Sequence, residues 1–479
     1  MMAPDTSHGP ALDAALDLIK DVVGGKGWSD DLDVHVPYVN AFRGGWKGKT
    51  ALLVRPANTQ EVSDVMMICS DACIPVVPQG GNTGLTGASV PDASGEQILL
   101  SLDRMAQVRD IDPLNYTITV DAGCILANIQ GAASEADRFF PLSLGAQGSC
   151  RIGGNISTNA GGVNVLRYGN ARDLVLGLEV VLPDGRIWNG LRRLRKDNTG
   201  YDLKQLFIGG EGTLGIITGA VLKLFPKPKD VQTCFAAIRD RGAMIELLTM
   251  CRTASGDSVT SFEYIPRIII DIDMRHLDGI SDPLERPYDH YALIEFSGAN
   301  PDSGMQAAME GMLESAFKDG IVLDAAISQS EAHRKAFWRI REEIVEASKY
   351  EGPRISHDVS VPVSDVPEFL NQTDAKLAEA LPGCRTGGFG HVGDGNIHYG
   401  VYAPFGMSAE DFEKNSKDLD HILLESVASF DGSFSAEHGI GQQKKAYMPI
   451  YRSEVELGLM RKLKAAIDPD NLMNPGKVF

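Results

Sequence analysis

Two glycine-rich tracts, residues 80–87 and 145–162, constrain the fold of this chain more than any other sequence feature. Such glycine density does not suit the interior of a helix or strand and indicates close approach of the backbone to a ligand. The first tract follows a strand, helix and strand predicted for residues 50–79, with Asn58 as N-cap and Glu61 three residues later. Backbone N–H groups at such a turn can converge on a pyrophosphate. We therefore expect a phosphate-bearing cofactor, although an ordinary loop would equally fit the first tract taken alone.

The spacing of these glycines argues against the commonest dinucleotide fold. Gly80, Gly81, Gly84 and Gly87 do not form the G-x-G-x-x-G pattern. No acidic residue follows about 20 positions later in a strand–helix–strand context, where it would bind a ribose. A Rossmann-type site is therefore disfavoured.

The composition is that of an ordinary soluble protein, and 479 residues are enough for roughly three domains. The net charge of −19 and the pI near 5.0 argue against nucleic-acid binding, which needs clustered Lys and Arg. No run approaches the ~20 apolar residues of a transmembrane segment. The stretch Met1–Leu18 contains Asp5, Asp13 and Asp17 and does not resemble a secretory signal. Cytoplasm is the expected location.

Seven cysteines, an odd number scattered along the chain, fit a reducing compartment. Cys69 and Cys73 could suggest a redox pair. However, both continue a helical spacing that begins at Val62, Val65 and Met66. We expect them to belong to a buried helical stripe.

The tract Phe225-Pro226-Lys227-Pro228-Lys229 is the clearest linker, because its prolines end the strand predicted for residues 216–224. Residues 231–326 then follow the order strand, helix, strand, strand, helix, strand, with 291–296 and 321–323 the clearest strands. That order predicts a ferredoxin-like α+β unit. Further helices are predicted at about 331–349, 409–428 and 453–466.

Two histidines on a glycine-rich connection, with a distant Glu-His pair, suggest a metal site. His391 and His398 flank Gly-Asp-Gly-Asn, which predicts a tight turn into a strand over 397–402. Glu437 and His438 follow the helix predicted at 409–428. Imidazole and carboxylate suit a borderline ion such as zinc, and three protein ligands leave a position open for substrate. A lone histidine is usually an ordinary surface or core residue, but here both blocks occur in one chain.

Nearly the whole chain resembles the vanillyl-alcohol-oxidase-type flavoproteins, whose FAD domain has these glycine blocks in this order. The resemblance is carried by residues 80–87, Pro141-Leu142-Ser143-Leu144-Gly145, residues 153–162, and residues 209–216. It implies a PCMH-type FAD-binding domain, and Asn82 stands where covalent members have a histidine, so the flavin should be non-covalent. The implied FAD-binding residues are Pro78, Gly80, Gly81, Asn82, Thr83, Gly84, Leu85, Gly87, Leu144, Gly145, Gly148, Ser149, Gly154, Asn155, Thr158, Asn159, Gly161, Glu211, Gly212, Gly215, Ile216 and Asn474.

The His391, His398 and Glu437-His438 blocks resemble those of the FAD-linked D-2-hydroxyacid dehydrogenases, the branch with D-lactate and D-2-hydroxyglutarate dehydrogenases. The resemblance implies that His391, His398 and Glu437 bind a divalent metal, most often Zn²⁺, with Mn²⁺ or Co²⁺ as alternatives. His438 would remove the hydroxyl proton as hydride passes to flavin N5. A Lewis acid at the α-hydroxyl orients the substrate and acidifies that hydroxyl.

The substrate pocket departs from the pattern of the D-2-hydroxyglutarate branch. The resemblance makes Arg341 a carboxylate-binding residue, whereas Val345, Ser356 and Gly400 stand where a threonine, a lysine and an asparagine are expected. The hydroxyacid chemistry is therefore predicted to be kept while recognition of the far end of the substrate has changed. Either Arg354 or His357 could compensate. The substrate could be D-2-hydroxyglutarate, D-lactate or a larger, less polar 2-hydroxyacid.

We thus predict an α+β, FAD-dependent, metal-assisted D-2-hydroxyacid dehydrogenase. The expected parts are an N-terminal arm (1–45), a PCMH-type FAD domain (46–226), a ferredoxin-like substrate domain (227–425) and a helical C-terminal segment over the flavin (426–479). The electron acceptor could be an electron-transfer flavoprotein or a quinone, and a homodimer is expected on general grounds. Two alternatives stay open: a non-catalytic FAD-binding subunit of a larger redox complex, and an oxygen-using 2-hydroxyacid oxidase.

Overall fold

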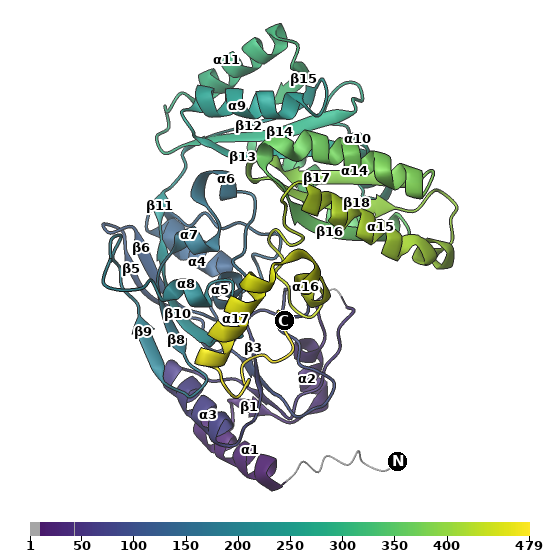
Figure 1. Cartoon of the computed structure of the whole chain (residues 1–479). Coiled ribbons are helices and arrows are strands. Elements are labelled where there is room, and N and C mark those ends of the chain that lie inside the picture. The colour runs from purple at the N-terminus through teal and green to yellow at the C-terminus, as the bar shows by residue number, and fades with distance from the viewer. Residues whose placement is uncertain (1–9, 43) are drawn as a thin grey trace. The chain divides into compact units, whose positions relative to one another are not determined.

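The computed structural model describes residues 10–42 and 44–479 and divides them into two compact units (Figure 1). The first unit contains the residues up to Gly161, then Asn170–Pro226 and Glu437–Phe479. The second contains Gly162–Gly169 and Lys227–Ala436. Asp5 and the first part of the expected N-terminal arm lie outside the described residues. The second unit is thus an insertion into a first unit built from separate stretches of chain.

Within its described residues, the first unit has one largely parallel sheet and one antiparallel sheet. The parallel sheet has the order β1-β2-β4-β3, and the other has the order β5-β6-β10-β8-β9. The strands are β1 (Trp28–Ser29), β2 (Leu52–Val54), β3 (Val76–Gln79), β4 (Ile98–Ser101), β5 (Val108–Asp112), β6 (Thr117–Asp121), β8 (Val175–Val181), β9 (Ile187–Gly190) and β10 (Ile216–Lys223), with β7 (Arg138–Phe139) and β11 (Phe225–Pro226) forming a short separate pair. The helices are α1 (Pro10–Val23), α2 (Leu32–Val39), α3 (Thr59–Asp71), α4 (Leu126–Glu135), α5 (Ile152–Ser157), α7 (Ala171–Leu174), α8 (Lys204–Phe207), η4 (Lys445–Tyr447), α16 (Met448–Tyr451) and α17 (Glu454–Ile467).

Helix α3, which connects β2 to β3, confirms one local prediction and corrects another. The Asn58 side chain accepts a hydrogen bond from the Glu61 N–H at 3.0 Å, as expected of an N-cap. The predicted buried stripe, however, ends at Cys69. Cys73 lies beyond the helix with φ of 53° and is exposed, because the chain turns there into β3. Both thiols are unpaired, and burial raises the pKa of Cys69 to about 12.

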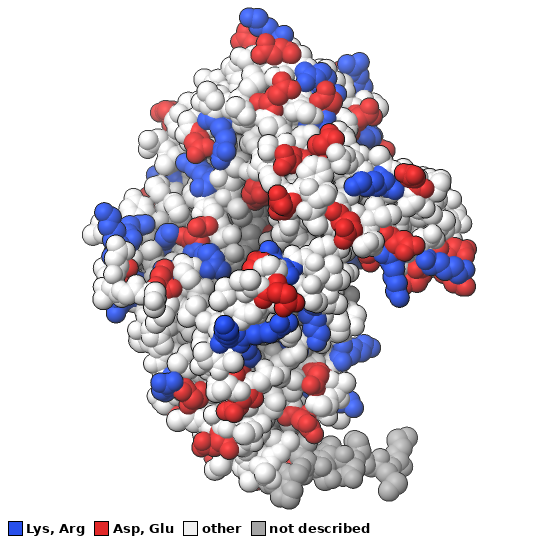
Figure 2. Space-filling view, viewed as in Figure 1, with Lys and Arg blue, Asp and Glu red and all other residues white. Residues whose placement is uncertain are grey.

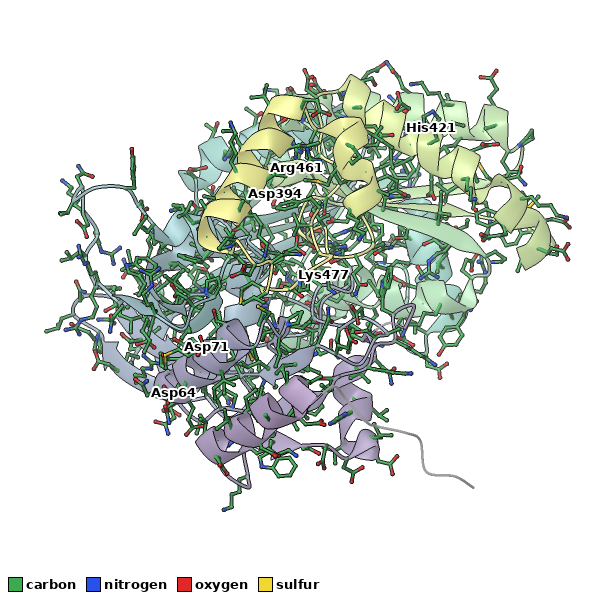
Figure 3. The ribbon with its side chains drawn as sticks, turned by 60° about the horizontal axis from the view of Figure 1, so that its bottom comes forward. Asp64, Asp71, Asp394, His421, Arg461 and Lys477 are labelled. Carbon is green, nitrogen blue, oxygen red and sulfur yellow. The ribbon has the colours of Figure 1, made fainter. Side chains whose placement is uncertain are left out.

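The C-terminal stretch is an interior part of the first unit. Met473 pairs with Val76 next to β3. The ammonium of Lys464, on α17, is buried and donates hydrogen bonds of 2.8 Å to the carbonyl oxygens of Thr213 and Met473. Lys477, labelled in Figure 3, is also buried, and burial lowers its pKa to about 8. These contacts join residues from the beginning, middle and end of the sequence.

The second unit is built on a mixed-order antiparallel sheet, β15-β12-β14-β13-β17-β18-β16 over its described residues. Numbered along the chain, β12–β15 stand in the spatial order fourth, first, third, second, which confirms the ferredoxin-like prediction. The strands are β12 (Asp230–Ile238), β13 (Val259–Pro266), β14 (His290–Gly298), β15 (Val322–Ile327), β16 (Arg354–Ser360), β17 (Arg385–His391) and β18 (Asn396–Tyr402). The helices are α6 (Val165–Tyr168), α9 (Ala243–Ser255), α10 (Arg267–His276), α11 (Met305–Lys318), α12 (Glu331–Glu342), α13 (Ile344–Ala347), η1 (Ser348–Tyr350), η2 (Val363–Asp365), α14 (Val366–Ala380), η3 (Val392–Asp394) and α15 (Ala409–Ser429).

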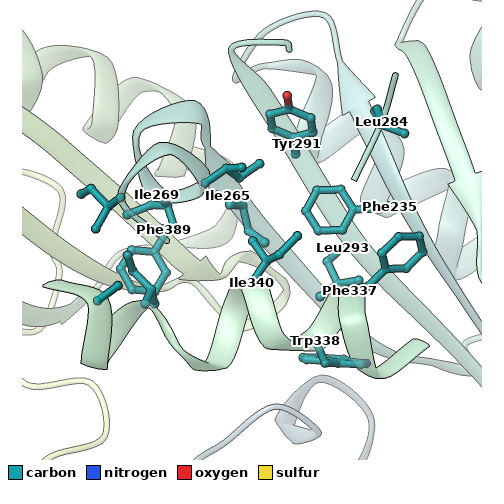
Figure 4. Packing of buried hydrophobic residues seen from close by; sticks show 14 of the residues in the cluster. Phe235, Ile265, Ile269, Leu284, Tyr291, Leu293, Phe337, Trp338, Ile340 and Phe389 are labelled. Atoms are coloured by element: carbon teal, nitrogen blue, oxygen red, sulfur yellow. The ribbon is translucent and has the colours of Figure 1, made fainter. Parts of the chain in front are cut away.

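An aromatic-rich core holds the second unit together (Figure 4). Helix α12 places Phe337 and Trp338 against the sheet, where Phe337 lies 5.5 Å from Phe235 between ring centroids. The helix predicted over 331–349 is interrupted at Glu343, so Val345 stands on the separate short helix α13. Helices α9 and α11 pack side by side, as do α14 and α15 (Figure 1).

The described surface agrees with the predictions made from composition. On the face drawn in Figure 2, acidic and basic side chains are interspersed, so the net charge of −19 is not gathered in one patch there. Over the described residues, no helix combines the length and apolar character needed to cross a membrane.

Candidate active site

The first unit contains a pocket, partly open to solvent, that the glycine blocks line. The predicted FAD-binding residues on its wall are Pro78, Gly80, Gly154, Thr158, Glu211, Gly212, Gly215 and Ile216. The wall also contains residues that were not predicted, among them Gln79, Ser89, Leu102 and Ser157. Gln79, Ser89 and Ser157 lie within two positions of predicted residues, whereas Leu102 follows β4 and lies outside every glycine block.

The glycines of the two tracts serve two different purposes. A Cβ on Gly81 would collide with the Ser149 carbonyl oxygen and lie 3.0 Å from Cys150 Cα, so this glycine lets the two tracts pack against each other. A Cβ on Gly84, Gly145 or Gly148 would meet no atom within 4 Å. The sequence prediction that glycine serves ligand approach is thus incomplete, because part of the glycine content serves chain packing.

Two buried amide oxygens near the cavity indicate which kind of ligand would fit there. Asn155 Oδ1 and Asn474 Oδ1 have no hydrogen-bond partner among the described residues. The Asn474 amide nitrogen is already used, donating to the Glu211 carbonyl oxygen at 2.8 Å and the Ala88 carbonyl oxygen at 3.0 Å. Buried polar atoms are rarely left unsatisfied. The residues present therefore fit a cofactor with hydrogen-bond donors, as a flavin has.

Several predicted residues make hydrogen bonds with the backbone of the first unit. Asn82 adopts φ of 53°, and its amide donates to the carbonyl oxygens of Asn40 at 2.8 Å and Pro37 at 3.0 Å. Asn159 Oδ1 accepts the Arg172 N–H at 2.9 Å. Thr83, Leu85, Gly87, Leu144, Ser149 and Gly161 are likewise outside the cavity wall.

Glu211 holds the chain immediately after His438. Its buried carboxylate accepts the Ile440 N–H at 2.7 Å and the Gly441 N–H at 2.8 Å. Burial raises the pKa of this carboxyl, although the two N–H groups oppose that shift. Thr86, from the first glycine tract, donates to the His438 carbonyl oxygen at 3.4 Å. The predicted base is thus anchored to the FAD-binding blocks of its own unit at its own carbonyl group and just after it in the chain.

In the second unit, β17 and β18 form the predicted hairpin, which brings the His391 and His398 ring centroids within 5.3 Å. The turn is held by Asp394 (Figure 3), whose carboxylate accepts the Asn396 N–H at 3.1 Å. His391 Nδ1 lies 2.5 Å from Glu263 on β13, and its Nε2 lies 3.2 Å from an Arg341 nitrogen. A guanidinium only donates, so Nε2 carries the lone pair and Nδ1–H donates to Glu263.

Glu263 was not anticipated from the sequence. Burial alone would raise its pKa, but the Arg341 charge and the hydrogen bond with His391 outweigh burial and hold it at about 2. Carboxylates that fix the tautomer of a histidine are typical behind metal ligands. With Nδ1 fixed, Nε2 is directed at a cation, which here is Arg341.

Asp358 is a second residue that the prediction missed. It is buried on β16, opposite His398 in the ladder, and its carboxylate lies 3.5 Å from His398 Nδ1. Asn396 donates to the same carboxylate at 2.8 Å. The Ala436 N–H donates to the Asp358 carbonyl oxygen, and Ala436 is the last residue of this unit. Glu437 follows it directly in the chain.

Comparison with known proteins establishes the family. The C-terminal domain of FAD-linked oxidases matches residues 220–478, and an FAD-binding domain matches residues 50–190. The probable mitochondrial D-2-hydroxyglutarate dehydrogenase of Oryza sativa subsp. indica is 38% identical over 96% of this chain and 80% of its own. A D-2-hydroxyglutarate dehydrogenase of Xanthomonas citri pv. viticola is 37% identical over 91% and 90%. The chain belongs to the FAD-linked D-2-hydroxyacid dehydrogenases.

Other comparisons refine this assignment. A D-2-hydroxyglutarate–pyruvate transhydrogenase of Saccharomyces cerevisiae is 37% identical over 90% of this chain and 87% of its own. Substrate-bound p-cresol methylhydroxylase matches with a TM-score of 0.75 and 16% identity over 100% of this chain and 98% of its own, which confirms the PCMH-type fold. Several relatives are named mitochondrial, so the comparisons do not support the cytoplasmic location expected from the sequence.

As a member of this family, the chain is an FAD-linked oxidoreductase.

The residues predicted to bind the substrate all lie in the second unit. Arg341 is buried and its guanidinium pairs with Glu263, so it is not a solvent-facing helix arginine. Val345 and Ser356 are exposed. Gly400 has a packing role, because a Cβ there would lie 3.0 Å from Tyr402 Cε2. His357 pairs with Asp420 at 2.6 Å on α15.

Proposed function

We propose that this protein oxidises a D-2-hydroxyacid to the 2-oxoacid, using non-covalent FAD and a divalent metal. The observation that carries the proposal is the imidazole of His391, whose Nε2 lone pair is directed at a cation by the Glu263 carboxylate. A hydroxyacid needs such a cation at its hydroxyl and carboxylate, and the FAD domain supplies the electron acceptor. Non-covalent binding is supported by Asn82, whose amide is used by backbone carbonyls.

The metal would be held by His391, His398 and Glu437, with Asp358 as a further donor beside His398. Two imidazoles and carboxylates suit Zn²⁺, while Mn²⁺ or Co²⁺ would accept the same donors. Glu437 directly follows Ala436, whose N–H donates to the Asp358 carbonyl oxygen. Such a metal, when bound, lowers the pKa of the substrate hydroxyl.

His438 would then remove the hydroxyl proton. Its backbone is anchored through Thr86 and Glu211 to the blocks that line the FAD cavity. An imidazole with a pKa near neutrality is the usual residue for this task. We expect His438→Ala to slow flavin reduction by roughly 10²–10⁴-fold while the flavin absorbance spectrum and bound FAD stay unchanged. Near-normal reduction in stopped flow would reassign the base.

The deciding experiment is anaerobic bleaching of the protein's flavin by D- and L-2-hydroxyacids, with and without a chelator. Bleaching that is fast, selective for D-acids and lost on chelation is expected. A flavin that no acid bleaches, with metal content verified, would instead favour a non-catalytic FAD-binding subunit. Fast reoxidation in air after bleaching would identify an oxidase.

The proposal also covers the physiological electron acceptor, the oligomeric state and the cellular location of the protein. An electron-transfer flavoprotein or a quinone would reoxidise the flavin, and the yeast relative's name adds a second 2-oxoacid as a candidate. Following bleaching, each acceptor can be added to the reduced protein and the return of flavin absorbance timed. A homodimer and a cytoplasmic location remain predictions, to be checked by light scattering and cell fractionation.

A further inference from the structure

Residues 162–169 form a short segment whose role the chemistry above leaves open. The segment belongs to the second unit, although Gly161 before it and Asn170 after it belong to the first. It contains helix α6 and directly follows the glycine tract, in which Gly154 and Thr158 line the FAD cavity. Ordering these residues away from the rest of their tract costs conformational entropy. Their contacts in the second unit must offset that cost.

Two polar contacts anchor this segment on the sheet of the second unit. The Val163 carbonyl oxygen accepts a hydrogen bond from the Ser261 hydroxyl at 2.7 Å. Arg167 donates to the Ser297 hydroxyl at 2.9 Å and to the Ser297 carbonyl oxygen. Ser261 stands two residues before Glu263 on β13, so these two side chains share a face of the sheet. The segment therefore lies on the face that carries Glu263.

Between these anchors, Leu166 packs against the turn that separates the two predicted histidine ligands. A Cβ on Gly393 would lie 2.7, 2.9 and 3.1 Å from three Leu166 side-chain atoms, which are the nearest atoms outside its chain neighbours. The backbone of Gly393 does not itself require glycine, because its φ lies outside the left-handed region, whereas Gly395 has φ of 82°. Glycine at position 393 thus makes room for Leu166, and Leu166 covers the turn η3.

This turn determines how far apart the two imidazoles stand, because His391 ends β17 and His398 lies on β18. Their ring centroids are 5.3 Å apart. The Val361 N–H holds the turn at one point by donating to the Gly395 carbonyl oxygen at 3.1 Å, and Leu166 holds it at another. A turn with two glycines has little stiffness of its own. A shift of the turn would therefore change the distance between the two ligands.

We infer that Leu166 is a positioning residue for the metal: by packing on Gly393, it fixes the turn and so the relative placement of His391 and His398. This inference rests on the proposed function and extends it, since an aliphatic side chain cannot itself bind the metal. Ligands that already stand in the right places bind a metal more tightly, because no rearrangement opposes binding.

The test is a double-mutant cycle on the FAD-loaded protein, with Zn²⁺ affinity measured by competition against a chromophoric chelator. Leu166→Ala leaves a gap beside the turn, and Gly393→Ala adds a methyl group that collides with Leu166. Each should weaken Zn²⁺ binding by roughly 10-fold. The double variant should recover to within roughly threefold of the wild type, because the added methyl group occupies the space that Leu166 leaves. Leu166→Met, which nearly keeps the side-chain volume, should bind Zn²⁺ as the wild type does.

Two further measurements separate positioning from general support of the fold. Leu277→Ala removes the same aliphatic group from a partly buried position against the core of this unit. It should lower thermal stability without weakening Zn²⁺ binding. With Co²⁺ in place of Zn²⁺, visible absorption reports the geometry of the ligands; Leu166→Ala should change that spectrum and Leu277→Ala should not. If Leu166→Ala does not fold, Leu166→Val gives the same comparison with a smaller change.

The outcomes distinguish this inference from the proposed function. Loss of Zn²⁺ affinity in both single variants and recovery in the double variant, without oxidation of any 2-hydroxyacid by the wild-type protein, would support the positioning role and overturn the proposed reaction. Additive losses in the double variant, or wild-type Zn²⁺ affinity in Leu166→Ala, would overturn the positioning role even if hydroxyacids are oxidised. Equal losses of Zn²⁺ affinity in Leu166→Ala and Leu277→Ala would overturn it as well.

Discussion

The predicted cofactor site of the first unit is formed largely by the backbone, whereas the predicted metal and substrate site of the second unit is formed by charged side chains. The FAD cavity is lined largely by glycines and apolar residues, and two buried amide oxygens near it have no hydrogen-bond partner in the described part of the chain. In the second unit, by contrast, both oxygens of the buried Glu263 carboxylate are engaged, one by Arg341 and one by His391. A large flat cofactor needs a cavity of matching shape with accessible N–H groups. A small acid and a metal ion need a defined number of charged groups at defined positions.

This contrast predicts different kinds of damage in the two units. Where backbones approach closely, one added methyl group is the harmful change, because neither chain can retreat. Where buried charges compensate one another, the harmful change is the loss of one charge at constant shape. Mutations of each kind therefore test whether the first unit depends on close backbone packing and the second on charge compensation.

The largest effect should come from Glu263→Gln, which keeps the shape and removes the charge. Arg341 would be left buried and uncompensated, so we expect the second unit to lose about 3–5 kcal/mol of unfolding free energy. Metal content should fall as well, because His391 loses the carboxylate that fixes its tautomer. Denaturant unfolding and metal analysis measure the two effects. Glu331→Gln removes an exposed partner of Arg334 and should cost less than about 1 kcal/mol; equal losses would contradict the contrast.

A smaller effect, of roughly 1–3 kcal/mol, is expected from Gly81→Ala in the first unit. The new methyl group would press the first glycine tract away from Ser149 and Cys150 and distort the FAD site. FAD retention after gel filtration and thermal unfolding check this. Gly131→Ala, on α4 with open space around it, is the control and should be neutral or stabilising. Gly84→Ala sharpens the comparison: normal unfolding with weaker FAD binding would show that its open space serves the cofactor.

The smallest effect concerns Asp273, the exception to charge compensation in the second unit. Its carboxylate is buried without a hydrogen-bond partner among the described residues, and burial, then the Glu343 charge, raises its pKa to about 8. The folded state therefore keeps a proton that the unfolded state releases near pH 4, so stability falls as pH rises from about 4 to about 8. Asp273→Asn should flatten this slope and add on the order of 1 kcal/mol at pH 8. Thermal unfolding across this pH range measures it, and an unchanged slope would refute the assignment.

Local sequence signals predicted local structure well. Asn58 caps its helix, the turn between His391 and His398 forms a hairpin, and the order of strands and helices gave the ferredoxin-like sheet. Each of these depends on residues a few positions apart or on simple alternation. The end of the stripe at Cys69 and the break at Glu343 were missed, because periodicity alone does not mark where a helix stops.

Partners distant in sequence could not be predicted from spacing. Glu263 meets His391 across 128 positions, and no motif in β13 marks it as a partner. Gly400 was interpreted as a lost polar contact, whereas the Tyr402 ring fills the space beside it. The alternation of side chains along a strand, by contrast, can be read from the sequence. Once β16 is assigned, it places Arg354 and His357 on opposite faces of the sheet.

The discontinuous first unit has a consequence for synthesis on the ribosome. Residues 437–479 are synthesised after the parts of the first unit that they contact, since Met473 pairs beside β3 and the Lys464 ammonium binds the Thr213 carbonyl oxygen. The inserted second unit has its whole chain by Ala436 and can begin to fold while the first is still incomplete. Nascent chains halted near residue 436 should therefore expose an unfinished flavin cavity, which chaperones would have to shield until helix α17 emerges.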